Sequence, residues 1–202
     1  MVATPSSPSN ELVESIDHRI VLHGVPWSHY EIMLAIRGDA PVPRMAYLKG
    51  ELELMSPSRD HEMIKSRIRQ LVEAYATAMD IELWPVGSWT IKSAPRERGV
   101  EPDECYTVGD PRDKDRPDLA IEVIWTSGGI GKLEIYRGLG VPEVWQWHDR
   151  HMRVFLLEDA GYREAEHSLL LPQLDIPLVA RLATASPREA LEALRLSLSA
   201  AE

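Results

Sequence analysis

The clearest periodicity in the chain is helical and lies between residues 60 and 79. Apolar residues recur there every three or four positions, which places them on one face of a helix: Ile64, Ile68, Leu71, Val72, Tyr75 and Met79. A second signal lies near the C-terminus, where Ser186, Pro187 and Glu189 combine an N-cap, a first-turn proline and a capping-box acid. Leucines follow at helical spacing, so we expect the chain to end in an amphipathic helix.

Two shorter helices are expected from weaker patterns. The first covers residues 28–37, where Ser28 and Glu31 match a capping box and a Gly-Asp pair ends the periodic segment. The second covers residues 130–139, between a glycine-rich loop and a Gly-Val-Pro sequence.

Short segments rich in β-branched and aromatic residues predict strands. They lie at residues 45–48, 51–55, 81–86, 88–92, 103–108, 119–125, 143–147 and 152–157. The first two surround Lys49 and Gly50 and are expected to form a hairpin. The order of helices and strands predicts an α/β fold in which helices flank a mixed β-sheet.

Length and composition favour one domain. The 202 residues, 44% of them hydrophobic, suffice for a single core. Residues 1–18 are rich in Ser, Pro and Glu, so a flexible tail is expected before a domain over 19–202. The N-terminus lacks the pattern of a secretion signal, and no apolar stretch approaches the roughly 18 residues that span a bilayer. A cytoplasmic protein without membrane contact is therefore expected.

Charge and cysteine content limit the chemistry. A single cysteine, Cys105, excludes internal disulfides and cysteine-based zinc sites and is expected to be an inert buried thiol. The 22 basic and 32 acidic residues give a net charge of -10, which argues against a protein that coats nucleic acid through general positive charge. An enzyme that acts on nucleic acid is compatible with this balance, because carboxylates that bind a divalent cation raise the acidic count.

Glu122 is the most informative residue, since it is the one charge in the apolar segment 119–125. A buried ionised carboxylate is costly unless it is paired or bound to metal. Asp103 begins the preceding strand, and neighbouring strands would place both carboxylates side by side, as suits Mg²⁺. A salt-bridged Glu122 with a loop Asp103 is the plainer alternative. Asp118 ranks below Asp103, because four strand residues separate it from Glu122 by about 13 Å.

The glycine-rich loop over residues 126–131 precedes a helix, as in a phosphate-binding P-loop. Thr126 and Leu133 break the pattern GxxxxGK[ST], so a nucleoside triphosphate site is not expected. Two interpretations stay open: the loop amides approach a DNA phosphate, or the glycines only form a compact turn.

Several motifs in a fixed order resemble one known family. They are Gly50-Glu51-Leu52-Glu53-Leu54-Met55-Ser56-Pro57, His61, Glu101-Pro102-Asp103, Pro117-Asp118-Leu119-Ala120-Ile121-Glu122-Val123, Lys132-Leu133-Glu134-Ile135-Tyr136 and Gly140-Val141-Pro142-Glu143-Val144-Trp145. In this order they resemble the Uma-two (Uma2) family of restriction-endonuclease-like proteins, a bacterial branch of the PD-(D/E)xK nucleases. The resemblance covers about residues 20–180 and implies a restriction-endonuclease-like α/β core, a divalent metal (Mg²⁺ or Mn²⁺) and DNA as substrate.

The resemblance also implies site residues. Asp103 and Glu122 match the acids that hold the metal in this superfamily, and Glu51 matches a position that can supply a further metal ligand. The lysine that normally follows the acid by two residues is replaced by Ile124. Lys132 matches the position at which this family carries its lysine, although the sequence alone also allows a solvated helix residue there.

His61 matches a family position as well, and the resemblance implies a phosphate contact or a water-positioning group. From the sequence alone, His61 can equally be a histidine at a helix N-terminus, and Glu51 an exposed carboxylate of the hairpin.

The expected function is Mg²⁺-dependent hydrolysis of DNA phosphodiester bonds by an endonuclease with Asp103, Glu122, Lys132 and His61 in its catalytic site. The alternative is a non-catalytic protein that keeps the nuclease fold as an oligomeric binding or regulatory module, which Ile124 and the net charge favour. A homodimer is expected, because nucleases that cut both strands often pair two sites. Trp145 and Trp147 in the strand at 143–147 are expected to lie in the core or to line the dimer interface.

Overall fold

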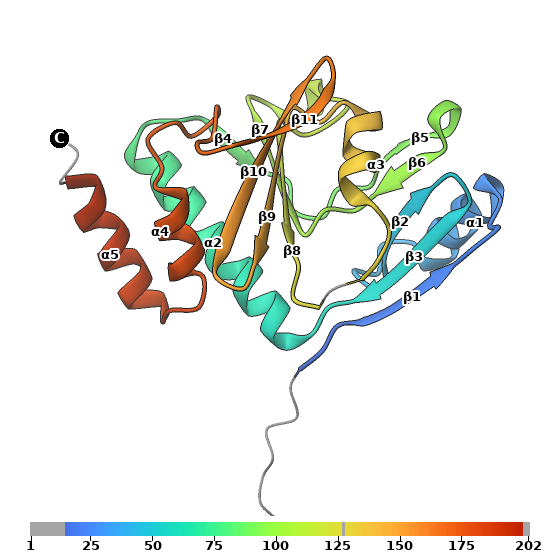
Figure 1. Cartoon of the computed structure of the whole chain (residues 1–202), viewed down its shortest axis with the longest axis horizontal. Coiled ribbons are helices and arrows are strands. Elements are labelled where there is room, and N and C mark those ends of the chain that lie inside the picture. The colour runs from blue at the N-terminus through green and yellow to red at the C-terminus, as the bar shows by residue number, and fades with distance from the viewer. Residues whose placement is uncertain (1–14, 127, 200–202) are drawn as a thin grey trace, which may run out of the picture.

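The computed structural model describes residues 15–126 and 128–199. In these ranges the chain forms two β-sheets, one of five strands and one of six, with helices packed around them (Figure 1). Most of the predicted tail, residues 1–18, lies outside the described residues. Its last part does not: Asp17 is buried and His18 begins the first strand, so the fold starts before the expected boundary at Arg19.

The five-stranded sheet is antiparallel throughout. Its strands lie in the order β1 (His18–Leu22), β3 (Glu51–Ser56), β2 (Arg44–Leu48), β6 (Arg98–Val100) and β5 (Ile91–Ser93). The pair β2–β3 is the predicted hairpin. Helix α1 (Trp27–Arg37) covers one face, where Tyr30 packs with Met45 and Tyr47. On the other face, Ala46 packs with Ala120 of the second sheet.

The six-stranded sheet is mixed, as predicted. Its strands lie in the order β11 (Gly161–Ala165), β10 (His151–Glu158), β9 (Glu143–His148), β8 (Leu119–Val123), β7 (Glu104–Val108) and β4 (Leu83–Pro85). Strands β8 and β9 are parallel, and helix α3 (Lys132–Leu139) forms the crossover between them. Every residue of β8 is buried, as its apolar sequence predicts.

The two faces of the six-stranded sheet have different neighbours (Figure 1). Helices α2 (Arg59–Ala78) and α4 (Ile176–Leu182) lie over one face, and α5 (Pro187–Ser199) packs against these two helices. Helix α3 and the five-stranded sheet lie over the other face. Along β8, Leu119 and Ile121 join the core beneath α2, whereas Ala120 joins the core beneath α3. Strand alternation therefore directs Glu122 into the space between the two sheets.

The fold class expected from the sequence is confirmed, and the strongest periodic signals hold. Helix α2 is capped by Ser58, whose hydroxyl accepts a hydrogen bond from the His61 amide (3.2 Å). At the start of α5, the Ser186 amide donates to the Glu189 carboxylate (3.2 Å), so the predicted capping box forms.

Other local expectations differ from the structure. Helix α1 begins after Pro26 without a side-chain cap, so the predicted capping box of Ser28 and Glu31 is wrong; Glu31 instead pairs with Lys92 (3.1 Å). Four elements were not expected: β1, β6, β11 and α4. Two short 3₁₀ helices, η1 (Ala94–Arg96) and η2 (Pro111–Asp113), complete the fold. No helix within the described residues has the length and apolarity to cross a bilayer.

The two tryptophans of β9 lie in the core of the chain itself. Trp145 and Trp147 are 0% and 2% exposed. Their indole N–H groups donate to the Glu143 carboxylate (2.6 Å) and to the Ala180 carbonyl (2.9 Å). The expectation that these rings line a dimer interface is therefore wrong, because both are buried within the chain itself.

Candidate active site

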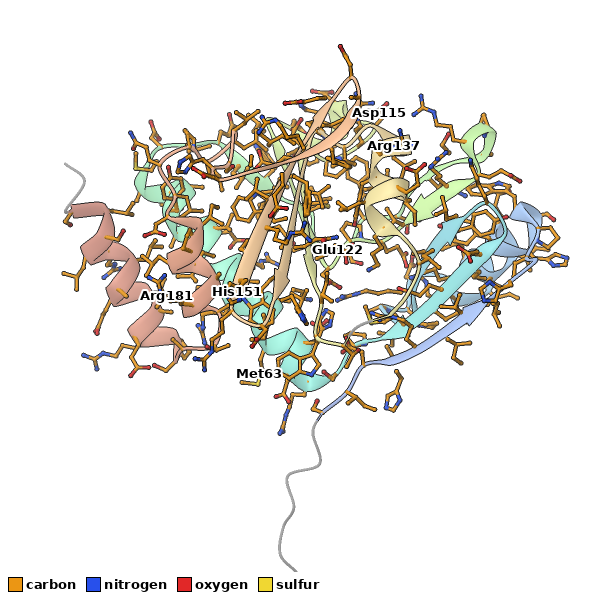
Figure 2. The ribbon with its side chains drawn as sticks, in the orientation of Figure 1. Met63, Asp115, Glu122, Arg137, His151 and Arg181 are labelled. Carbon is orange, nitrogen blue, oxygen red and sulfur yellow. The ribbon has the colours of Figure 1, made fainter. Side chains whose placement is uncertain are left out.

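A pocket of about 230 Å³ lies where β8 and α3 meet the five-stranded sheet. Its polar lining comes from five elements, β1, β3, β8, β9 and α3, and consists of Arg19, Glu53, Glu122, Gln146 and Lys132. Figure 2 shows Glu122 near the middle of the molecule, between the strands of the two sheets. The acid predicted from its place in an apolar strand thus lies at the wall of a cavity.

Glu122 is held by two residues of α3. The Lys132 ammonium donates to Glu122 Oε2 (2.6 Å), and the Tyr136 hydroxyl, one turn further on, donates to Oε1. Burial raises the pKa of Glu122 to about 7; Lys132 opposes this rise and the charge of Asp103 adds to it. Burial thus disfavours the ionised form of Glu122, and Lys132 only partly offsets this effect.

Lys132 is not a solvated helix residue. Its side chain is 16% exposed and points from the first turn of α3 back to β8. Burial alone would lower the pKa of Lys132, but the Glu122 and Asp103 carboxylates outweigh burial and raise it. Ile124, at the usual lysine position of the superfamily, also lines the pocket. Lys132 of α3 therefore brings to the pocket the positive charge that Ile124, just after β8, does not supply.

Asp103 lies opposite Glu122. Glu104 pairs with Ile121 in the antiparallel register of β7 and β8, and one further step pairs Asp103 with Glu122. The backbone amide of Val123 donates to Asp103 Oδ2 (2.7 Å). The two carboxylates expected to meet on neighbouring strands are thus brought together by the register.

Two cationic side chains hold the other oxygen of Asp103. The Arg44 guanidinium donates to Oδ1, and His61 Nε2 lies 3.1 Å from the same atom. Burial would raise the pKa of Asp103, but the hydrogen bond and charge of His61, with the charges of Lys132 and Arg44, lower it well below its usual range. Asp103 is therefore ionised at every physiological pH.

His61 lies between two carboxylates. Its Nδ1 is 2.9 Å from Asp17 Oδ2, and the other ring nitrogen faces Asp103. Burial lowers the pKa of His61, but the hydrogen bonds and charges of Asp103 and Asp17 raise it to about 9. The ring is an imidazolium at neutral pH, so His61 lies beside Asp103 as a buried cation at the start of α2.

Glu51 lies away from the pocket. Its carboxylate is 44% exposed and lies 3.2 Å from His23 Nδ1 near the hairpin turn. The pocket acid of β3 is Glu53, which is 2% exposed and accepts a hydrogen bond from the Ile130 amide (3.1 Å). Arg19 Nε lies 3.4 Å from the same Glu53 oxygen. The further acid predicted at position 51 is thus replaced in the pocket by the acid two residues along the same strand face.

The glycine loop packs against Glu53. Gly129 has a φ of +109°, and a Cβ atom there would lie 2.2 Å from Glu53 Oε2. Only glycine permits both the backbone conformation and this close approach. The Ile130 amide points at a carboxylate, so it is not free for a phosphate, and the compact-turn interpretation of the loop fits the structure.

Two further residues behave as the sequence predicts. Asp118 accepts a hydrogen bond from the Val108 amide (2.8 Å) and pairs with Lys114 (3.0 Å) at the opposite end of β8. Cys105 is fully buried, and burial raises the pKa of its thiol to about 12. Neither residue reaches the pocket.

Comparison with known proteins identifies the family. A family model described as Uma2, "putative restriction endonuclease", matches residues 27–191, more than half of the chain. The chain belongs to the Uma2 family. No curated protein matches the chain. A solved structure from Anabaena variabilis ATCC 29413, described as "a putative nuclease belonging to DUF820", is 13% identical over 75% of this chain and 92% of its own, with a TM-score of 0.48.

The donor set of this Uma2 protein suits a hard divalent cation. Among residues 15–126 and 128–199, no three His, Cys, Asp or Glu side chains form a metal-binding group. Mg²⁺, however, commonly takes one or two carboxylates and completes its shell with water and phosphate. Asp103 and Glu122 supply two hard oxygen donors, and burial, which Lys132 only partly opposes, raises the pKa of Glu122, so a further cation would stabilise its ionised form.

Several residues at this Uma2 site were not foreseen from the sequence, among them Arg19, Arg44, Glu53, Tyr136 and Asp17. Glu53 carries no signal that separates it from Glu51, because both alternate with leucines on the same face of the strand. Tyr136 lies one helical turn after Lys132, so helical spacing could have indicated that both reach Glu122. Asp17 carries no comparable signal, because it lies in a polar segment whose contacts depend on how distant parts of the chain meet.

Proposed function

We propose that this protein is a Mg²⁺-dependent endonuclease that hydrolyses DNA phosphodiester bonds in the cytoplasm. The observation that carries the proposal is the buried pair of Asp103 and Glu122, which lie opposite each other with the Lys132 ammonium 2.6 Å from Glu122. Membership of the Uma2 family supports the same reaction class.

Asp103 and Glu122 would hold the ion. A bound Mg²⁺ supplies a Lewis acid that polarises a phosphoryl oxygen and lowers the pKa of water. Asp103 suits this role because it stays ionised, and the Val123 amide fixes its Oδ2, which keeps an unused lone pair. Glu122 Oε1 and Oε2 each have one protein donor, from Tyr136 and Lys132, and so each retains acceptor capacity.

Lys132 and Arg19 would bind the anionic substrate. One N–H of the Lys132 ammonium is used by Glu122, which leaves two donors for phosphate oxygens. Arg19 brings a second positive charge to the same pocket from β1. Fixed donors directed at oxygens that gain charge in the transition state are the largest contribution that such a site can make.

One observation favours a second candidate, a non-catalytic binding module. Asp103 and Glu122 already have protein cations as partners, namely Arg44, His61 and Lys132. A site whose charges are paired in this way is stable without a metal. The alternative predicts a folded protein that binds Mn²⁺ weakly and leaves DNA intact.

The two candidates are separated by one assay. Purified protein is incubated with supercoiled plasmid in Mg²⁺, Mn²⁺ or EDTA, beside Asp103→Ala and the surface control Asp159→Ala. The proposal predicts nicking or linearisation with metal by the wild type and Asp159→Ala, and intact plasmid with Asp103→Ala or EDTA. Intact plasmid in every lane, or equal cleavage by Asp103→Ala, contradicts the proposal.

A homodimer is part of the proposal, because cutting both strands at one position needs two sites in opposite orientation. Since Trp145 and Trp147 are internal, another surface must form the contact. Light scattering at micromolar concentration tests this point: twice the 22.8 kDa chain mass supports a dimer and the single mass contradicts it.

A further inference from the structure

The segment before β1 is bound to the site by specific contacts. The Ser15 carbonyl accepts a hydrogen bond from Trp125 Nε1 (2.5 Å), just beyond the end of β8. Two residues later, Asp17 Oδ1 accepts from the Ser58 amide (2.8 Å) at the start of α2. The segment thus bridges the two elements from which Glu122 and His61 project.

Asp17, His61 and Asp103 lie in a buried row, with a hydrogen bond between Asp17 and His61 and an ion-pair contact between His61 and Asp103. Asp17 Oδ2 lies 2.9 Å from His61 Nδ1, and His61 Nε2 lies 3.1 Å from Asp103 Oδ1. The side chains of all three residues are 0% exposed. Burying a carboxylate is costly unless it is paired. His61 and the Ser58 amide are the partners that offset this cost for Asp17.

We propose that Asp17 is a positioning residue for Asp103 and acts through His61. This inference rests on the proposed function and adds to it that the N-terminal segment is a component of the metal-binding site. Groups that hold the ligands of a metal ion in place typically cost about 10–100-fold in metal affinity or activity when they are lost. His61 would be such a group for Asp103, and Asp17 holds His61.

The geometry explains why the orientation of His61 matters. Asp103 Oδ1 faces His61 and Arg44, and Oδ2 accepts from Val123 and keeps a free lone pair. If the imidazole turned, Oδ1 would lose one of its two cationic neighbours and the carboxylate could rotate about its χ2 bond. Asp17 prevents this turn, because it holds the ring at the nitrogen remote from Asp103.

The variant Asp17→Asn tests the proposal with little change in shape. Its amide has one acceptor oxygen, which can serve either the Ser58 amide or His61 but not both as Asp17 does. We expect Mn²⁺ affinity, measured by electron paramagnetic resonance without DNA, to fall about 10–100-fold. The single-turnover cleavage rate should fall similarly, while half-saturation by DNA changes less than about twofold. The exposed control Asp159→Asn should match the wild type.

The outcomes separate this inference from the proposed function. Wild-type Mn²⁺ affinity and cleavage in a folded Asp17→Asn variant overturn the positioning role and leave the nuclease proposal intact. A wild type that neither binds Mn²⁺ nor cuts plasmid overturns both. If circular dichroism shows that Asp17→Asn does not fold, His61→Gln tests the same link from its other side: a 10–100-fold loss of Mn²⁺ affinity supports the inference, and unchanged affinity overturns it.

Discussion

At the scale of single residues, Asp103 and Glu122 show how surroundings give two neighbouring carboxyl groups different properties. Asp103 lies beside Arg44 and His61, which keep it ionised. Glu122 lies opposite Asp103, and burial, which Lys132 only partly opposes, raises its pKa to about 7. A pair of acids with pKa values moved in opposite directions is typical of a catalytic site.

Glu122→Gln is expected to abolish metal-dependent cleavage and to leave the free energy of unfolding at pH 8 equal to or above that of the wild type. Because the pKa of Glu122 is raised, folding favours its protonated form. The contribution of Glu122 to the free energy of unfolding is therefore complete below its ordinary pKa of 4.5 and is lost as the pH rises through 7. The single amide oxygen of the variant can accept from Lys132 or from Tyr136, which the two carboxylate oxygens serve separately in the wild type. Urea unfolding at pH 5 and pH 8, with plasmid cleavage, checks this; retained cleavage contradicts the assigned role.

Lys132→Met is expected to keep or increase Mn²⁺ affinity, since lysine is no metal ligand and its ammonium competes for Glu122. The cleavage rate should fall by about two to three orders of magnitude, the cost of losing one transition-state donor. Mn²⁺ binding and single-turnover cleavage are measured on one preparation, with the exposed Lys49→Met as control. Wild-type rates in Lys132→Met would leave the site without a catalytic lysine and favour the non-catalytic alternative.

His61 should make metal-free stability depend on pH. Because the pKa of His61 is raised to about 9, its contribution is complete below the ordinary value of 6.5 and is lost as pH rises from 6.5 through 9. The shift corresponds to about 3 kcal/mol. Unfolding in EDTA between pH 6 and pH 9.5 measures it in the wild type and in His61→Gln. An equal loss of stability in both proteins would contradict the role of His61.

At the scale of elements, the sequence predicted what local patterns determine. The periodic face of α2 and the capping box of α5 need no distant information, and both are found. Among the strands that were missed, β6 has only three residues, and β1 starts at His18, one residue before the expected beginning of the domain at Arg19. Such edge or very short strands owe their conformation to the partners they pair with, which local propensity does not reveal.

The candidate site, like the fold, was predictable only where local sequence determines it. Asp103 and Glu122 could be identified because a charge in an apolar strand needs a compensating partner on the adjacent strand. The choice of Glu53 over Glu51 depends on where the glycine loop packs, and the contact of Asp17 with His61 joins positions 44 residues apart. Both depend on how the two sheets dock, which no local pattern in the sequence records.

The glycine loop provides a matched pair of substitutions at the element scale. Gly128 and Gly129 both have a positive φ, of +100° and +109°, so alanine is strained at either position. A Cβ at Gly129 meets Glu53, whereas one at Gly128 meets nothing within 4 Å. Gly129→Ala should therefore lower cleavage at least tenfold more than Gly128→Ala. Equal rates in the two variants would show that contact between the loop and Glu53 has no part in activity.

At the scale of the whole molecule, the site lies at the junction of the two sheets. The six-stranded sheet supplies Glu122, Asp103 directly precedes its strand β7, and the five-stranded sheet supplies Arg19, Arg44 and Glu53. A protein with a net charge of -10 thus gathers several cations around its buried acids. The local balance of charge, rather than the net charge, decides whether an anionic substrate can enter.

The account depends most on the claim that Asp103 and Glu122 hold one divalent ion. The most direct measurement is the anomalous scattering of Mn²⁺ in a crystal of the full chain. The account predicts one strong peak in the pocket, about 2.0–2.3 Å from an oxygen of Asp103 and an oxygen of Glu122, as expected for a hard divalent cation. Crystals in which Mn²⁺ is absent from the pocket, while Arg44 and Lys132 still pair with both carboxylates, would contradict it.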